Sequence, residues 1–164
     1  MIRKILLGLL AVLIIIQFFH PEKNKSESKQ TGNIAGVYEV PADVKAILDK
    51  ACADCHSNNT VYPWYSKIQP VDWWLDNHIA EGKEELNFDE FAKYSLSRQY
   101  HKLEELTKTV KEGEMPLNSY TWIHTNARLK EEEKNALINW ADTIRTGMRE
   151  KYPVDSLVRK KMQH

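Results

Sequence analysis

Two cysteines and a histidine form the run Cys52-Ala53-Asp54-Cys55-His56, and the 164-residue chain has no other cysteine. The Cys-x-x-Cys-His pattern is the attachment signal of c-type haem. Two thiols three positions apart can reach the two vinyl groups on one edge of a porphyrin, and the next residue then lies beneath the iron. The run therefore predicts one haem c, bound covalently through Cys52 and Cys55, with His56 as an axial ligand.

Three other interpretations of the cysteine pair are weaker. A thioredoxin-type pair stands in a strand–helix context, and the chain shows no alternating strand pattern. A zinc site needs a second ligand pair at short spacing, whereas His78, His101 and His124 are each more than twenty residues apart. A structural disulfide remains open, but a loop this short gives it little stabilising effect.

Met115 is the first candidate for the second axial ligand. It stands in Gly113-Glu114-Met115-Pro116, where the glycine ends a predicted helix and the proline favours an extended conformation for the methionine. Methionine opposite histidine raises the reduction potential of a haem relative to two histidines. The alternative is that Met115 fills a gap in the core. His78, four residues after Trp74, is the second candidate for an iron ligand.

A haem also needs flat apolar neighbours, and tryptophan supplies these together with a polar N–H. Trp64 follows the attachment run closely, and Trp140 lies on the buried face of a predicted helix. We therefore expect these two side chains to form walls of the haem site, although ordinary core packing explains each of them as well.

Helical periodicity runs through the rest of the chain and predicts an all-α fold. One helix begins at Pro41 and carries both cysteines at its C-terminal end, and the last begins at Glu131 and ends at Gly147. Asn87 and Glu90 have the spacing of a capping box, which predicts a helix with Phe88, Phe91 and Ala92 directed inward. The other predicted helices run from Pro70 to Gly82 and from about Leu103 to Gly113.

The N-terminal segment reads as an export signal, because Arg3 and Lys4 precede an apolar run. We divide the chain into a signal anchor or signal peptide (1–19), a flexible polar linker (20–36), the haem c-binding domain (37–147) and a C-terminal tail (148–164). The signal predicts a periplasmic or other extracytoplasmic domain, tethered to the inner membrane where the segment is retained. A formal net charge of zero gives no indication of nucleic-acid binding.

The attachment run and several later segments resemble the bacterial haem-binding domain family and, more broadly, mono-haem class I c-type cytochromes. The resemblance covers roughly residues 37–146 and rests on 52–60, Pro63-Trp64-Tyr65, 78–82, 86–88, 113–116, Tyr120, His124, 127–129 and Trp140. It implies a small cytochrome c-like helical domain around one haem. It also implies attachment of the haem at Cys52 and Cys55, proximal ligation by His56 and distal ligation by Met115.

Two kinds of function fit this site. With both axial positions filled by the protein, the haem would carry single electrons between membrane redox proteins, and the protein would not be an enzyme. With a labile distal ligand, the same site would serve a haem-based sensor or a peroxidase-like enzyme. The Met-Pro segment favours the electron carrier.

Overall fold

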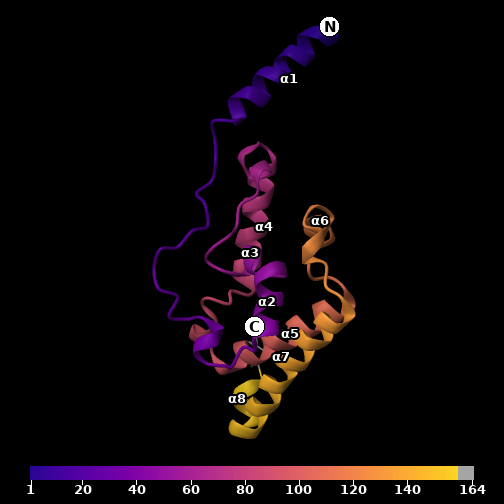
Figure 1. Ribbon diagram of the computed structural model, residues 1–164. Coiled ribbons are helices and arrows are strands. Elements are labelled where there is room, and N and C mark those ends of the chain that lie inside the picture. The colour runs from indigo at the N-terminus through magenta and orange to yellow at the C-terminus, as the bar shows by residue number, and fades with distance from the viewer. Residues whose placement is uncertain (159–164) are drawn as a thin grey trace.

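The computed structural model describes residues 1–158, a part of the chain that contains helices and no strand. The predicted all-α fold is therefore confirmed. Figure 1 shows α1 standing apart from a body in which the other helices pack together. The helices are α1 (Ile2–Ile16), α2 (Ala42–Ala51), α3 (Ala53–His56), α4 (Val71–Glu85), α5 (Leu96–Glu112), α6 (Asn118–Ile123), α7 (Glu131–Lys151) and α8 (Val154–Leu157). The short 3-10 turns are η1 (Ile34–Gly36), η2 (Trp64–Lys67), η3 (Phe91–Lys93) and η4 (Thr125–Ala127).

The hydrophobic core lies where α2, α5 and α7 meet. Each helix contributes the apolar stripe predicted from its periodicity, with Ile47 on α2, Leu103 on α5 and Leu137 on α7 all buried. Gly113 adopts a left-handed conformation with φ of 75° and ends α5, which glycine tolerates without steric cost.

The last long helix continues past Gly147, where the sequence analysis placed its end, to Lys151. The physical reason is that Met148 extends the buried stripe by one more turn. After a break at Pro153, α8 buries Leu157 and packs against α5. The basic run 159–161 of the predicted tail lies outside the described residues.

The helix predicted around Phe88 is wrong, because the chain forms only the short turn η3 there. Asn87 accepts a hydrogen bond from the Asp89 backbone N–H, and Glu90 binds Asn58 instead of closing a capping box. Phe88 and Phe91 are nevertheless buried in the core. The spacing of the apolar residues therefore predicted the burial of both phenylalanines correctly, but the helix that it also predicted does not form.

The segment predicted as a flexible linker makes hydrogen bonds along one side of the domain. Asn24 donates to the Ser57 carbonyl and the Thr60 hydroxyl, each at 2.9 Å, and Asn33 donates to Asp89 at 2.7 Å. Asn24 thus finds its partners in the loop after the attachment run, and Asn33 finds its partner just before η3. The segment is visible in Figure 1 as the long thin coil that runs beside α3 and α4.

The apolar N-terminal stretch forms α1, whose side chains are exposed along its length. Its C-terminal end is fixed to the start of α4, since the Gln17 amide donates to the Gln69 carbonyl at 3.2 Å and accepts from the Gln69 N–H at 3.0 Å. Within residues 1–158, no helix is both long enough and apolar enough to cross a membrane.

Candidate functional site

His56 is held in one orientation by the backbone that follows α4. Its Nδ1 donates to the Leu86 carbonyl at 2.8 Å, and its own carbonyl accepts from the Phe88 N–H at 2.8 Å. Burial lowers the pKa of the imidazole below its usual range, against the opposing effect of the Leu86 hydrogen bond. With its proton on Nδ1, the neutral ring keeps a lone pair on Nε2 for a metal.

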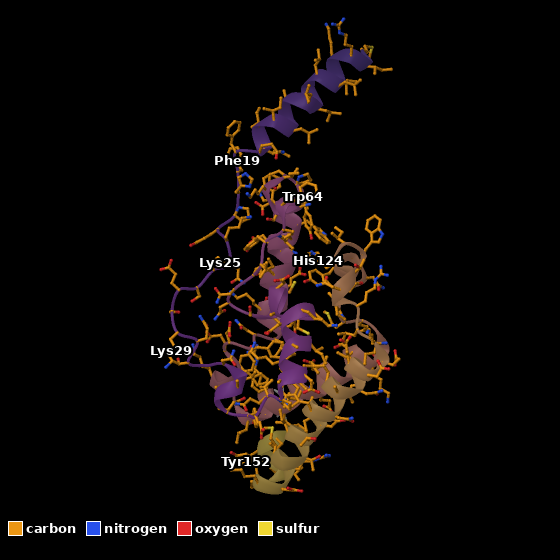
Figure 2. All side chains as sticks on the ribbon, viewed as in Figure 1. Phe19, Lys25, Lys29, Trp64, His124 and Tyr152 are labelled. Carbon is orange, nitrogen blue, oxygen red and sulfur yellow. The ribbon has the colours of Figure 1, made fainter. Side chains whose placement is uncertain are left out.

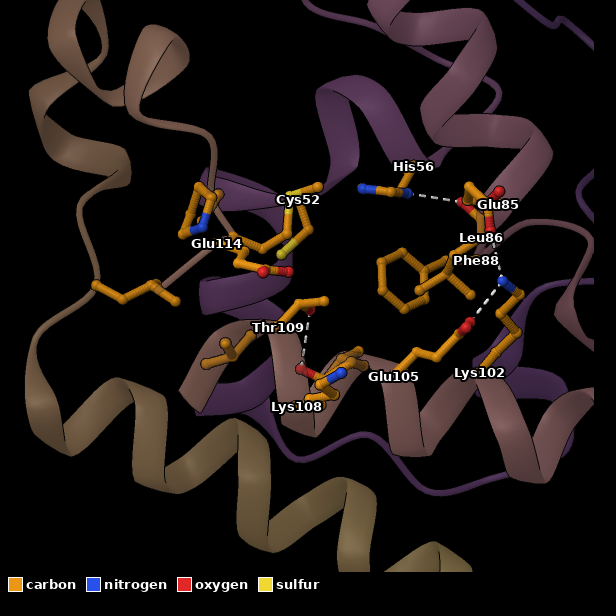
Figure 3. Close-up of a pocket in the computed structure, with 16 residues that line it drawn as sticks. Cys52, His56, Glu85, Leu86, Phe88, Lys102, Glu105, Lys108, Thr109 and Glu114 are labelled. Atoms are coloured by element: carbon orange, nitrogen blue, oxygen red, sulfur yellow. Dashed lines mark hydrogen bonds and ion pairs between the residues drawn. The ribbon is translucent and has the colours of Figure 1, made fainter. Parts of the chain in front are cut away.

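Two cavities, of about 290 and 310 Å³, share His56 in their walls. Figure 3 shows the first one, with His56 and Phe88 on one side and the residues of α5 below. Apolar side chains line much of it, including Leu106 and Val110. Both cavities also share Cys52 and Met115, so they form adjoining spaces beside the attachment run. A flat apolar group that contacts both the histidine and the cysteines fits this space.

The two thiols lie on the walls of these cavities. Cys52 ends α2 with φ of −126°, and the chain then turns into α3, which carries Cys55 and His56. The predicted single helix is therefore two helices with a break at the first cysteine. Both thiols are free. Burial raises the pKa of Cys52 to about 12 and that of Cys55 to about 11, which keeps both protonated at neutral pH.

Gly82 lets α4 pass directly over the attachment run. A Cβ at this position would meet the Cys55 carbonyl oxygen at 2.7 Å and the Cys55 Cβ at 3.1 Å. A side chain of any size would therefore separate α4 from α3. Gly82 was expected to end the helix, but α4 continues to Glu85, so its role is close packing.

We expect Gly82→Ala to lower the free energy of unfolding by about 1–3 kcal/mol, because the backbone of Cys55 leaves no room for a methyl group. Gly147→Ala is the matched control, since Gly147 is also helical and a Cβ there would contact nothing within 4 Å. The control variant should gain about 0.5–1 kcal/mol. Denaturant unfolding of both variants measures the difference, and equal effects would contradict a packing role for Gly82.

Met115, which follows α5 in the chain, also lines these cavities. The segment after Gly113 turns back on α5, where the N–H groups of Glu114 and Met115 donate to the Thr109 carbonyl at 2.9 and 3.2 Å. Met115 lines both cavities together with His56. The structure therefore brings the two predicted axial ligands to one space.

His78 lines the second cavity as well. Its Nδ1 donates to the Trp74 carbonyl at 2.9 Å, and its ring lies over the Trp74 indole at a centroid distance of 4.2 Å. This arrangement leaves Nε2 without the proton in the neutral ring. His78 thus stays an alternative ligand within the same site.

A family model described as a haem-binding domain matches residues 11–143. The chain belongs to this haem-binding domain family. Comparison with curated proteins and with solved structures finds no match for the chain. Membership supports a haem cofactor, and the residues present fit that group: the imidazole of His56 is oriented by a carbonyl, the neighbouring cavities are largely apolar, and two thiols stand on their walls.

The two tryptophans predicted to wall the haem are not brought to these cavities. Trp64 begins η2 and is 76 % exposed. Trp140 is buried in the core, where its Nε1 donates to the Glu39 carbonyl at 2.9 Å. Leu86, Phe88 and Leu106 line the first cavity in their place.

A polar network beside the attachment run was not predicted. The Tyr120 hydroxyl donates to Asp54 Oδ2 at 2.7 Å, and Asp54 Oδ1 accepts from the Val61 N–H at 2.9 Å. Burial and this hydrogen bond raise the pKa of Tyr120 far above its usual range. Tyr120 also stacks on His124, which bonds the Tyr65 hydroxyl at 2.6 Å. In the sequence, the feature that could have indicated this network is Asp54, an acidic residue between the two cysteines.

Proposed function

We propose that the protein carries one haem attached covalently through Cys52 and Cys55, and that it serves as a one-electron carrier outside the cytoplasm. The observation that carries this proposal is the pair of adjoining cavities whose walls combine Cys52, His56 and Met115. These residues come from the end of α2, from α3 and from the segment before α6. Their types are those of a covalent haem with histidine and methionine as axial ligands.

Each residue has a distinct part in this proposal. Cys52 and Cys55 would hold the porphyrin covalently. His56, whose ring is held in place by the Leu86 carbonyl, would bind the metal through Nε2. Met115, which lines the same cavities, would be the second protein ligand of the metal and would keep substrates from binding it. When bound, the haem supplies reversible one-electron chemistry at iron. The apolar side chains around His56 exclude water and thereby help to set the reduction potential.

The proposed location rests on the N-terminal segment. Two basic residues, Arg3 and Lys4, lie in the first turn of α1 and precede its apolar run, which is the pattern of an export signal. Residues 1–19 would then act as a signal anchor or a signal peptide. The partners would be membrane-associated redox proteins on the same side of the membrane.

The optical spectrum of the haem-loaded protein, recorded with and without carbon monoxide, tests the carrier function. We expect a weak far-red charge-transfer band in the ferric protein, because methionine sulfur binds the iron, and little reaction of the ferrous protein with carbon monoxide. Ready binding of carbon monoxide in a protein without the band would contradict the carrier. That result would instead favour a haem sensor or a peroxidase-like enzyme with a labile distal ligand.

A further inference from the structure

Exposed aromatic side chains gather at the end of the domain where α1 departs. Three tryptophans there are exposed, Trp64 by 76 %, Trp73 by 41 % and Trp74 by 46 %. Ile68 and Val71 add exposed aliphatic surface between them. Together these five residues, here called the aromatic end, lie between the start of η2 and the first turn of α4 and are outside the core.

The aromatic end is joined to the exit of α1 by hydrogen bonds. Trp73 Nε1 and the Gln69 amide both donate to the Phe19 carbonyl, at 2.9 and 2.6 Å. Asp72, which is buried, binds His20 at 2.7 Å and Lys23 at 2.5 Å. Figure 2 shows Phe19 and Trp64 at this end of the domain and Tyr152 at the opposite end. The exit of α1 and the aromatic end therefore lie side by side.

The side chains of α1 and of the aromatic end are both suited to contact with lipid. α1 is apolar all round after Arg3 and Lys4 and buries no residue along its described length, and such a helix needs an apolar environment. Tryptophan is enriched at membrane–water interfaces, where its ring is apolar and its N–H reaches water. Between residues 64 and 74 the charged residues are the exposed Lys67, suited to an anionic headgroup, and the paired Asp72.

We propose that the aromatic end rests in the interface of a phospholipid bilayer beside α1, so that the membrane holds the domain in one orientation. The proposal deepens the membrane location in the proposed function and does not depend on how the haem is ligated. Gly82, which contacts the attachment run, lies eight residues after Trp74 on α4. At 1.5 Å per residue this places Gly82, and with it the attachment run, about 12 Å along α4 from Trp74.

The rate of thiol modification by a charged, membrane-impermeant maleimide tests this contact. Trp64→Cys and Trp74→Cys are made in the full haem-loaded chain and reconstituted in vesicles of phosphatidylcholine and phosphatidylglycerol. A thiol in the interface has a raised pKa, and each unit lowers its thiolate fraction and hence its rate about tenfold. The reaction rate of both variants should therefore be lower than that of Trp122→Cys by a factor of about ten or more. Trp122→Cys is the matched control, because Trp122 lies on α6 and is 79 % exposed.

Glu150→Cys, near the opposite end of the domain, measures the fraction of protein facing the outer solution. A second set of variants carries Ile68→Cys as the reporter thiol and combines it with Trp64→Glu and Trp74→Glu. These changes should restore a fast reaction at position 68, whereas Trp122→Glu should leave it slow. If positions 64 and 74 react as fast as position 122, the proposal is overturned and the aromatic end is free for a protein partner. A denaturing gel of the same samples reports haem attachment separately.

Discussion

Replacing both Cys52 and Cys55 by alanine is expected to remove essentially all haem from the protein on a denaturing gel. Thioether bonds survive unfolding, whereas the bond from His56 to iron and the apolar contacts of the cavity do not. Both thiols lie on the cavity walls beside His56, so their loss takes away the covalent link and leaves the axial ligand in place. Staining the gel for haem peroxidase activity measures the result.

The single variants sharpen this prediction. Cys52→Ala and Cys55→Ala each leave one thiol, so each should retain part of the covalent haem, with visible bands shifted to longer wavelength by the remaining conjugated vinyl group. Met115→Ala is the control, because it changes an axial ligand and should keep the full covalent signal on the gel. Haem that still migrates with the double alanine variant on the denaturing gel would contradict covalent attachment through Cys52 and Cys55.

The parts of the fold that were predictable from sequence are those with long, regular periodicity. The stripes containing Ile47, Leu103 and Leu137 extend over several helical turns, so one face of each helix had to be buried. The stretch around Phe88 and Phe91 is too short to distinguish a helix from a turn, because either places two phenylalanines inward. Burial was predictable there, and the local backbone was not.

The attachment run and Met115 were found because their chemistry depends on residue type and local spacing. The walls of the cavity depend on tertiary packing, which a single sequence does not encode in any short pattern. Trp64 stands near the attachment run in sequence but lies on the surface, whereas Leu106 is far away in sequence and lines the cavity. Size and aromatic character were therefore a poor guide to which side chains surround the site.

The segment between Phe19 and Ile34 shows a related limit. Its composition of lysine, serine, glutamine and asparagine is typical of a flexible linker. In the structure Asn24 and Asn33 donate hydrogen bonds to the domain, and Lys23 pairs with the buried Asp72. Polar composition says that a segment buries little apolar surface, and it says nothing about complementary polar partners elsewhere in the chain.

Met115→Ala is expected to abolish the far-red band of the ferric protein and to open the ferrous protein to carbon monoxide. The methionine lines the same cavities as His56, and alanine has no atom that can bind iron. The reduction potential should fall, because methionine opposite histidine raises it relative to nitrogen or water ligands. Optical spectroscopy and a redox titration of the purified, haem-loaded variant measure these changes.

His78→Ala provides the matched comparison, since His78 lines the second cavity and is the alternative ligand. The Nδ1–H of its imidazole already donates to the Trp74 carbonyl, and its ring lies tilted against the Trp74 indole, which explains its position without any role at iron. This variant should keep the far-red band and resist carbon monoxide. The reverse pattern, an unchanged Met115→Ala spectrum and an altered His78→Ala spectrum, would transfer distal ligation to His78. The two variants together thus decide which side chain completes the site.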